Sequence, residues 1–317
     1  IREAKFVGPR ADDDLARLLA ALLKPVWANG ALALQSLTIA HQRRNFLTDK
    51  GAVAIAQAIE ENHHLKNLVL FGSDLGDSAA WALASALEQN RTLEALGFYG
   101  KRLTGKGTAA FCRMLQAGTC QLKELLVGGT EFNDQDASEL LTSVHSARIV
   151  EPPRLCKISV LNYCLGDETA KAVAHILSCG IVEVNLLAGR MTDDGASAVA
   201  RALADQASGA HSRGPGPELR TLRIASEKAG DVGLGRFAGA WSAGSPREHL
   251  ELAFGGASQA RCEEFVALGG AGSPGHLSAG GATRRTLTAT CRFQEYLDEV
   301  VFSQLMLRAA PSDLSSR

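Results

Sequence analysis

A repeated spacing of apolar residues organises most of the chain. Three apolar positions, separated by two residues and then by one, recur between Leu34 and Phe254. The alternation of apolar and other residues within each copy predicts one short strand. The copies are Leu34, Leu37, Ile39; Leu65, Leu68, Leu70; Leu93, Leu96, Phe98; Leu122, Leu125, Val127; Leu155, Ile158, Val160; Ile181, Val184, Leu186; Leu219, Leu222, Ile224; and a degraded copy near Leu252 and Phe254.

A second pattern follows each triplet. An apolar residue is followed, two positions later, by an aspartate, except that Gly105 follows Leu103. An aspartate side chain accepts hydrogen bonds from the unpaired N–H groups of a helix's first turn, so it marks a helix start. Ala- and Leu-rich segments such as Ala52–Ile59 and Ser78–Leu87 then predict helices. The pairs are Leu47 and Asp49, Leu75 and Asp77, Phe132 and Asp134, Leu165 and Asp167, and Met191 and Asp193.

A strand followed by a helix, repeated with a period near 28 residues, resembles the leucine-rich repeat family. The long strand-plus-helix unit resembles its ribonuclease-inhibitor-like subclass. The resemblance implies an α/β fold, a leucine-rich repeat solenoid (horseshoe) with parallel strands on the concave face and helices on the convex face. One departure concerns the Asn or Cys that the family usually has after the strand. Its positions hold Ser73, Lys101, Thr130, Tyr163 and Gly189.

The repeat boundaries define three parts. Residues 1–33 are expected to form an N-terminal helical cap, with a helix over Asp12–Leu23 that Pro25 ends. Residues 34–255 would hold seven or eight repeats. Residues 256–317 would hold a Gly-rich insertion and a C-terminal capping helix over Leu287–Leu307. Interruptions at residues 143–154, 207–217 and 269–282 are expected to be loops at the repeat edges.

Composition and charge exclude some partners and some compartments. The formal net charge is −1, so we expect no nucleic acid or anionic membrane as partner. The longest strongly apolar run, Leu18–Leu23, is too short for a transmembrane segment. Seven cysteines without a C-x-x-C pair favour a reducing intracellular compartment, in the cytoplasm or an organelle interior. Ile1 is consistent with a processed or truncated start, and the localisation stays unknown.

The sequence contains no pattern typical of catalysis or of a cofactor site. Eight histidines are scattered, without a metalloprotease motif or a zinc-like spacing. Gly270, Gly272 and Gly275 match a dinucleotide-binding pattern only formally, because no strand-to-helix unit surrounds them. We therefore expect a protein that is not an enzyme, with no catalytic residue, metal or cofactor.

Strand alternation identifies the side chains expected on the concave face. The residues between the buried ones form an apolar band, and the flanking Glu124, Lys157 and Glu183 would supply a polar rim. A large apolar band on a solvated surface is a candidate partner site. Two alternatives stay open: the terminal insertions fold back over the band, or the band is buried because the strands end there. The predicted partner-binding residues are Val69, Phe71, Tyr99, Leu126, Leu161 and Leu187.

The sequence thus predicts a non-catalytic protein–protein interaction module, a scaffold or accessory subunit of a multi-subunit assembly that binds other proteins through the concave apolar face. The alternative is a regulator of a partner enzyme, because members of the resembling family inhibit ribonucleases or stimulate Ran-type GTPases. An inhibitor of basic ribonucleases would need a strongly acidic concave face. The predicted face is mixed and apolar, which favours the first hypothesis.

Overall fold

The structure is a computed structural model of the whole chain. It describes residues 2–7, 11–24, 34–40, 47–147, 155–208, 219–244, 246, 248–270, 285–291 and 293. These residues divide into two compact units, one ending at Phe132 and the other beginning at Asn133. The predicted loop over residues 207–217 lies almost wholly outside the described residues, as do most of the loops predicted over 143–154 and 269–282.

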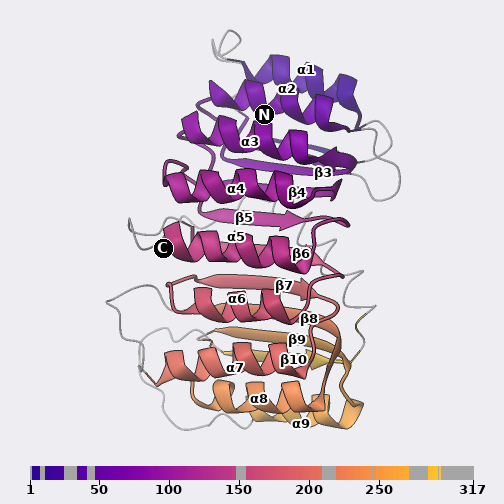
Figure 1. Cartoon of the computed structure of the whole chain (residues 1–317), viewed down its shortest axis with the longest axis vertical. Coiled ribbons are helices and arrows are strands. Elements are labelled where there is room, and N and C mark those ends of the chain that lie inside the picture. Colours follow the sequence, from indigo (N-terminus) through magenta and orange to yellow (C-terminus); the bar gives the residue numbers. More distant parts are fainter. Residues whose placement is uncertain are drawn as a thin grey trace. The chain divides into compact units, whose positions relative to one another are not determined.

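Strands and helices alternate strictly along unit 1, the part before Asn133. Its five strands pair side by side in chain order and in parallel, and its helices lie on one side of this sheet (Figure 1). The elements are β1 (Glu3–Val7), α1 (Asp13–Leu23), β2 (Ser36–Ala40), α2 (Asp49–Glu60), β3 (Asn67–Gly76), α3 (Asp77–Gln89), β4 (Ala95–Arg102), α4 (Gly105–Ala117) and β5 (Glu124–Gly128).

Unit 2, the part from Asn133 onward, has the same architecture. Its strands are also parallel, and each pairs with the strand of the next repeat. The elements are α5 (Asp134–Ala147), β6 (Lys157–Asn162), α6 (Asp167–Leu177), β7 (Glu183–Ala188), α7 (Asp193–Ala207), β8 (Thr221–Gly230), α8 (Asp231–Ser242), β9 (His249–Gly256), α9 (Gln259–Gly270) and β10 (Thr286–Thr290). The predicted α/β fold of the leucine-rich repeat solenoid class is therefore confirmed.

The apolar triplets form the interior of each unit. Leu65, Leu68 and Leu70 are fully buried, and so are the helix residues Leu83 and Leu87 that belong to the same repeat. A single strand and helix could not exclude water from these side chains, whereas the next repeat covers them. Burial of one leucine contributes about 1.5 to 3 kcal/mol, so repetition of the triplet accounts for the core.

In seven of the described helices an aspartate in the first turn connects that helix to the next one, whereas α4 has no acidic residue there. Asp77 of α3 accepts hydrogen bonds from the Thr104 backbone N–H (2.8 Å), the Thr104 hydroxyl (2.7 Å) and the Gly107 backbone N–H (3.0 Å) at the start of α4. The N-terminal N–H groups of a helix have no partner within the helix, and the helix dipole favours a negative charge there. We call these residues the relay aspartates: Asp13, Asp49, Asp77, Asp134, Asp167, Asp193 and Asp231.

A glycine in the receiving helix allows the relay carboxylate to approach. A Cβ atom at Gly107 would lie 2.5 Å from Asp77 Oδ1 and 2.7 Å from Leu103 Cδ1. A Cβ atom at Gly233 would lie 2.7 Å from Asp193 Oδ1. These separations are shorter than van der Waals contact, so only glycine fits without displacing the carboxylate.

Buried asparagines connect the opposite ends of the helices in unit 1. The side-chain amide of Asn90 donates to the backbone carbonyls of Ile59 (2.6 Å) and Asn62 (2.9 Å), and its oxygen accepts from the Leu93 N–H (2.7 Å). Asn62 makes the corresponding bonds one repeat earlier, to Leu23 and Leu65. An asparagine ladder therefore exists, but it lies between helix and strand and not after the strand.

The structure changes two of the predicted boundaries. The helical cap expected over residues 1–33 agrees with helix α1 and its N-cap Asp12, but β1 precedes this helix and pairs with β2. The helix predicted over Leu287–Leu307 is wrong at its start, because Leu287 lies in strand β10. The alternating threonines of Thr286–Thr290 favour an extended chain, and β9 offers an edge for it to pair with. Residues 294–307 lie outside the described residues.

We predict that Asp193→Ala lowers the free energy of unfolding by about 1 to 2 kcal/mol, because two partly buried hydrogen bonds to Gly230 and Gly233 are lost. Asp194→Ala is the matched control, since Asp194 shares the first turn of α7 and its favourable dipole but is exposed. Urea unfolding of both variants gives the comparison. Equal losses would show that the bonds between repeats add nothing to the effect of the helix dipole.

Two glycines of helix α8 should respond oppositely to alanine. Gly233→Ala should destabilise the protein by about 1 to 3 kcal/mol, because the new methyl group overlaps the Asp193 carboxylate and Ala196. Gly239→Ala should stabilise it by about 0.4 to 1 kcal/mol, because a Cβ atom there meets nothing within 4 Å and alanine favours the helix. Thermal unfolding tests both, and a stabilising Gly233→Ala would contradict the proposed close approach.

Candidate functional site

The sheet face is the face of each unit's sheet that points away from its helices. The strand register places the predicted outward residues in columns on this face. In unit 1, Val69 is paired with Gly97 and Gly97 with Leu126, while Phe71 is paired with Tyr99. In unit 2, Leu161 is paired with Leu187. The columns expected from the sequence therefore exist within each unit.

Exposure of the predicted apolar band differs from the expectation. Val69 (6% exposed), Leu126 (1%), Leu161 (3%) and Leu187 (5%) are buried, so the expectation that they face water is wrong. Shielding by in-register neighbours does not account for this burial, because Gly97, which lies between Val69 and Leu126, has no side chain. The role of these four residues in partner binding stays a prediction.

Phe71 and Tyr99 are half-buried and form the aromatic part of the unit 1 sheet face. Their rings are stacked, with centroids 4.7 Å apart and an interplanar angle of 20°. Residues directly opposite each other on paired strands lie close enough for this contact. The stack holds the two rings in a fixed orientation relative to each other.

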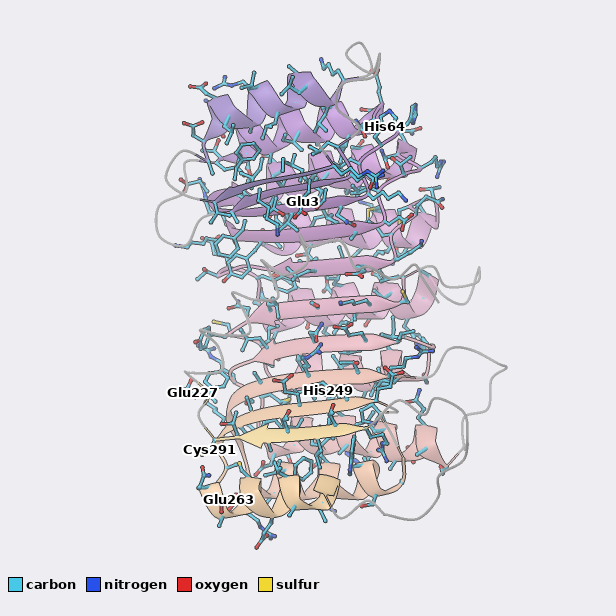
Figure 2. All side chains as sticks on the ribbon, turned by 180° about the vertical axis from the view of Figure 1, so that it is seen from behind. Glu3, His64, Glu227, His249, Glu263 and Cys291 are labelled. Carbon is cyan, nitrogen blue, oxygen red and sulfur yellow. The ribbon has the colours of Figure 1, made fainter. Side chains whose placement is uncertain are left out.

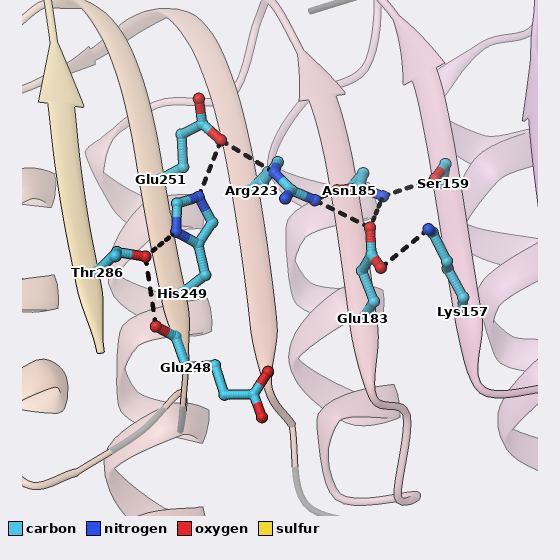
Figure 3. Close-up of polar contacts among 9 residues, drawn as sticks. All are labelled: Lys157, Ser159, Glu183, Asn185, Arg223, Glu248, His249, Glu251 and Thr286. Atoms are coloured by element: carbon cyan, nitrogen blue, oxygen red, sulfur yellow. Dashed lines mark hydrogen bonds and ion pairs between the residues drawn. The ribbon is translucent and has the colours of Figure 1, made fainter. Parts of the chain in front are cut away.

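A row of polar side chains crosses the sheet face of unit 2. We call it the polar row: Lys157 and Ser159 on β6, Glu183 and Asn185 on β7, Arg223 on β8, His249 and Glu251 on β9, and Thr286 on β10 (Figure 3). Figure 2 views the sheet from the side away from the helices and shows His249 on this face. Register explains the row, because Lys157 is paired with Glu183, and Arg223 with Asn185 and Glu251.

Opposite charges alternate along the polar row. Glu183 accepts from Lys157 Nζ (2.9 Å), Asn185 Nδ2 (3.0 Å) and Arg223 Nη1 (2.9 Å). Arg223 also donates through Nε to Glu251 Oε2 (3.0 Å), so one guanidinium joins two carboxylates on different strands. With His249 neutral, two cations balance two carboxylates and the row carries no net charge.

His249 connects the end of the polar row to the last described strand. Its Nε2 lies 3.2 Å from Glu251 Oε2, and its Nδ1 forms a hydrogen bond with the hydroxyl of Thr286. A neutral ring with its proton on Nε2 donates to Glu251 and accepts from Thr286. The imidazole therefore connects β9 and β10 through side chains in addition to their backbone pairing.

The two glutamates of the row are held in their charged form. Burial opposes the ionisation of Glu183, but the charge of Lys157, the hydrogen bonds from Asn185 and Lys157, and the charge of Arg223 outweigh it and lower the pKa of this carboxyl. Burial likewise opposes ionisation of Glu251, and His249 and Arg223 together lower its pKa. The row therefore stays zwitterionic at neutral pH.

Sequence reasoning found only part of the polar row. It named Lys157 and Glu183 as rim residues. It missed His249 and Glu251 because the ninth strand reads as a degraded repeat. The available signal was the alternation His249, Leu250, Glu251, Leu252, in which polar and apolar residues take turns as they do in β7.

The described residues give no support for a metal site or a membrane-spanning helix. No group of three or more His, Cys, Asp or Glu side chains in them could hold a metal ion. None of the described helices combines the length and the apolar character needed to span a bilayer.

We predict that Glu183→Gln lowers the free energy of unfolding by roughly 1 to 2 kcal/mol at pH 7, because Lys157 and Arg223 lose a charged partner. A lowered folded-state pKa contributes stability that is fully present above the unfolded glutamate value of about 4.3 and is lost as pH falls through the lower pKa of the folded state. The difference between wild type and variant should therefore shrink in acid.

Urea unfolding from pH 3 to pH 7 measures this dependence. Glu168→Gln is the control, because Glu168 pairs with Lys171 on the exposed surface of α6 and should change stability by less than about 0.5 kcal/mol. A pH-independent difference for Glu183→Gln would contradict the role of its charge.

The chain is weakly similar in structure to other solved proteins. No protein-family model matches the sequence, and no curated protein matches it. A structure titled "Leiomodin-1 Actin-Binding Site 2 (ABS2)" is 19% identical with a TM-score of 0.37, over 47% of this chain and 79% of that chain. A complex of Rad7 and Elc1 in yeast is 12% identical with a TM-score of 0.30, over 80% of this chain and 79% of that chain. The functional argument therefore rests on the residues of this chain.

Proposed function

We propose that the chain is a non-catalytic protein–protein interaction module, a scaffold or accessory subunit of a larger assembly that binds through its sheet face. We further propose that its repeats are of the ribonuclease-inhibitor-like subclass, since every described helix between two strands is a full α-helix. The observation that carries the function is the stacked, half-buried pair Phe71 and Tyr99 on the sheet face of unit 1.

Two properties of this pair suit a binding contact. Aromatic side chains are enriched at protein interfaces and supply much of the binding energy, because they bury a large area for few rotatable bonds. The stack between Phe71 and Tyr99 also fixes the rings before binding, which lowers the entropy lost on association. Val69 and Leu126 lie on the same face but are buried, so they do not themselves need to touch the partner.

Unit 2 offers a surface of another kind. The polar row has no net charge, so it gives no long-range attraction toward a strongly acidic or basic partner. Its alternating charges can instead select partners with a matching local pattern, since misplaced like charges weaken an interface. We propose that an aromatic contact supplies affinity in unit 1 and that the polar row supplies selectivity in unit 2.

The test replaces Phe71 and Tyr99 with alanine in the full chain. If the pair binds a partner, the proteins that co-purify with the native chain should fall at least tenfold in yield, because loss of a central aromatic contact costs about 2 kcal/mol or more. Quantitative mass spectrometry of affinity-purified material gives the yields. Circular dichroism and the thermal midpoint show whether the double variant is folded.

Leu18→Ala is the matched control, because Leu18 is an exposed apolar residue of unit 1 that lies on helix α1 and not on the sheet face. It should leave the co-purified proteins unchanged. Undiminished yields from a folded double variant would refute binding through Phe71 and Tyr99. If the double variant does not fold, the single variants Phe71→Ala and Tyr99→Ala decide the same question.

A further inference from the structure

A cysteine and a histidine lie in contact in unit 2, away from the sheet face. His145 Nδ1 is 2.8 Å from the sulfur of Cys179. His145 lies in the last turn of α5, and Cys179 follows the end of α6 in the turn that leads to β7. Both side chains are half-buried, so solvent reaches the pair.

We propose that Cys179 is the most reactive thiol of the chain and a site of reversible mixed-disulfide formation, with His145 as its base. The thiolate is the nucleophilic form of cysteine, and an adjacent imidazole produces it by accepting the thiol proton. A nitrogen 2.8 Å from the sulfur is well placed for this transfer.

The imidazolium that the transfer creates would lie at the carbonyl end of a helix. The carbonyl end of a helix carries a partial negative charge, and a cation in the last turn is stabilised by it. His145 occupies this place on α5. The imidazolium would then sit beside the new thiolate, so the two opposite charges stabilise each other.

The co-reactant is a small disulfide such as oxidised glutathione. The Cys179 sulfur attacks one sulfur of the disulfide, and a new S–S bond forms while the old one breaks. The departing thiolate takes the proton that His145 accepted from Cys179, so it leaves as a thiol and the imidazole returns to its neutral form. Cys179 is oxidised, the departing half of the small disulfide is reduced, and no further reagent is required.

The repeat architecture supplies an internal control in Cys120. Cys120 lies two residues before Leu122, as Cys179 lies two residues before Ile181, and it is also half-buried. Its repeat-equivalent of His145 is Glu88, since each lies eleven residues after its relay aspartate, Asp77 or Asp134. The equivalent position therefore carries a carboxylate, which does not favour a thiolate.

Cys262 marks the opposite limit of reactivity. Burial, with a smaller effect of nearby Cys291, raises the pKa of the Cys262 thiol to about 11. A neutral, buried thiol attacks disulfides slowly. The chain therefore contains thiols of graded reactivity, and their order can be measured in one sample.

The experiment labels the native full-length chain with iodoacetamide at pH 7 and follows each cysteine-containing peptide over time by mass spectrometry. Cys179 should react at least tenfold faster than Cys120, and Cys262 should be slower still. Incubation with oxidised glutathione should place its adduct first on Cys179, and dithiothreitol should remove it. Equal rates for Cys179 and Cys120 in the wild-type chain would overturn the proposal without any variant.

The variant His145→Gln tests the role of the base. It should reduce the rate at Cys179 about tenfold, to that of Cys120, and leave Cys120 and the thermal midpoint unchanged. An unchanged or faster rate at Cys179 would show that His145 only packs against the sulfur, and would also overturn the proposal. A higher labelling rate at Cys120 would show that the variant is unfolded. The comparison of Cys179 with Cys120 in the wild-type chain then tests the proposal.

Discussion

Most repeats are joined to the next by a carboxylate at the start of the helix, and the order of the repeats within each unit depends on this contact. Helix α4, which begins at Gly105, has no acidic residue in its first turn. A relay aspartate satisfies N–H groups of the following helix that would otherwise lack a partner, and it does so with a charge that the helix dipole favours. Asp167, for example, binds the N–H groups of Thr192 and Gly195. Because the distance between helices is fixed in this way, the strands that follow are held in register, and the columns of the sheet face result.

The sequence was sufficient to predict the repeat, but not the hydrogen bonds that join one repeat to the next. The triplets predicted the strands, and Asp49, Asp77 and Asp193 predicted helix starts. Each aspartate was expected to cap its own helix, whereas the structure shows that it caps the next one. The glycines two residues after these starts, such as Gly51 and Gly195, were the available signal. Each of these glycines makes room for an aspartate that lies about 30 residues earlier along the chain. A pattern read within one repeat does not include that aspartate.

The sheet face shows a similar limit. Alternation correctly placed Phe71, Tyr99 and Leu126 on it, because side-chain direction in a strand has a period of two. Alternation does not determine exposure, because it says nothing about which residues pack against a face. Leu126 is buried although it points outward and its neighbour Gly97 has no side chain, whereas Phe71 and Tyr99 remain half-buried. Orientation is a local property, but exposure depends on every residue that packs against the face, including residues distant along the chain.

Equivalent positions in a repeat protein share a backbone geometry but not a chemistry. Cys120 and Cys179 occupy equivalent positions before a strand. The equivalent position on the preceding repeat's helix holds Glu88 in the first case and His145 in the second. The same reasoning applies to the sheet face, where one column gives stacked rings in unit 1 and aliphatic side chains in unit 2. The regular contacts of the fold fix where side chains stand, so a single substitution at a repeated position changes the local chemistry without altering the architecture. Searching for sites in such a chain therefore means comparing equivalent positions and asking where one repeat departs from the others.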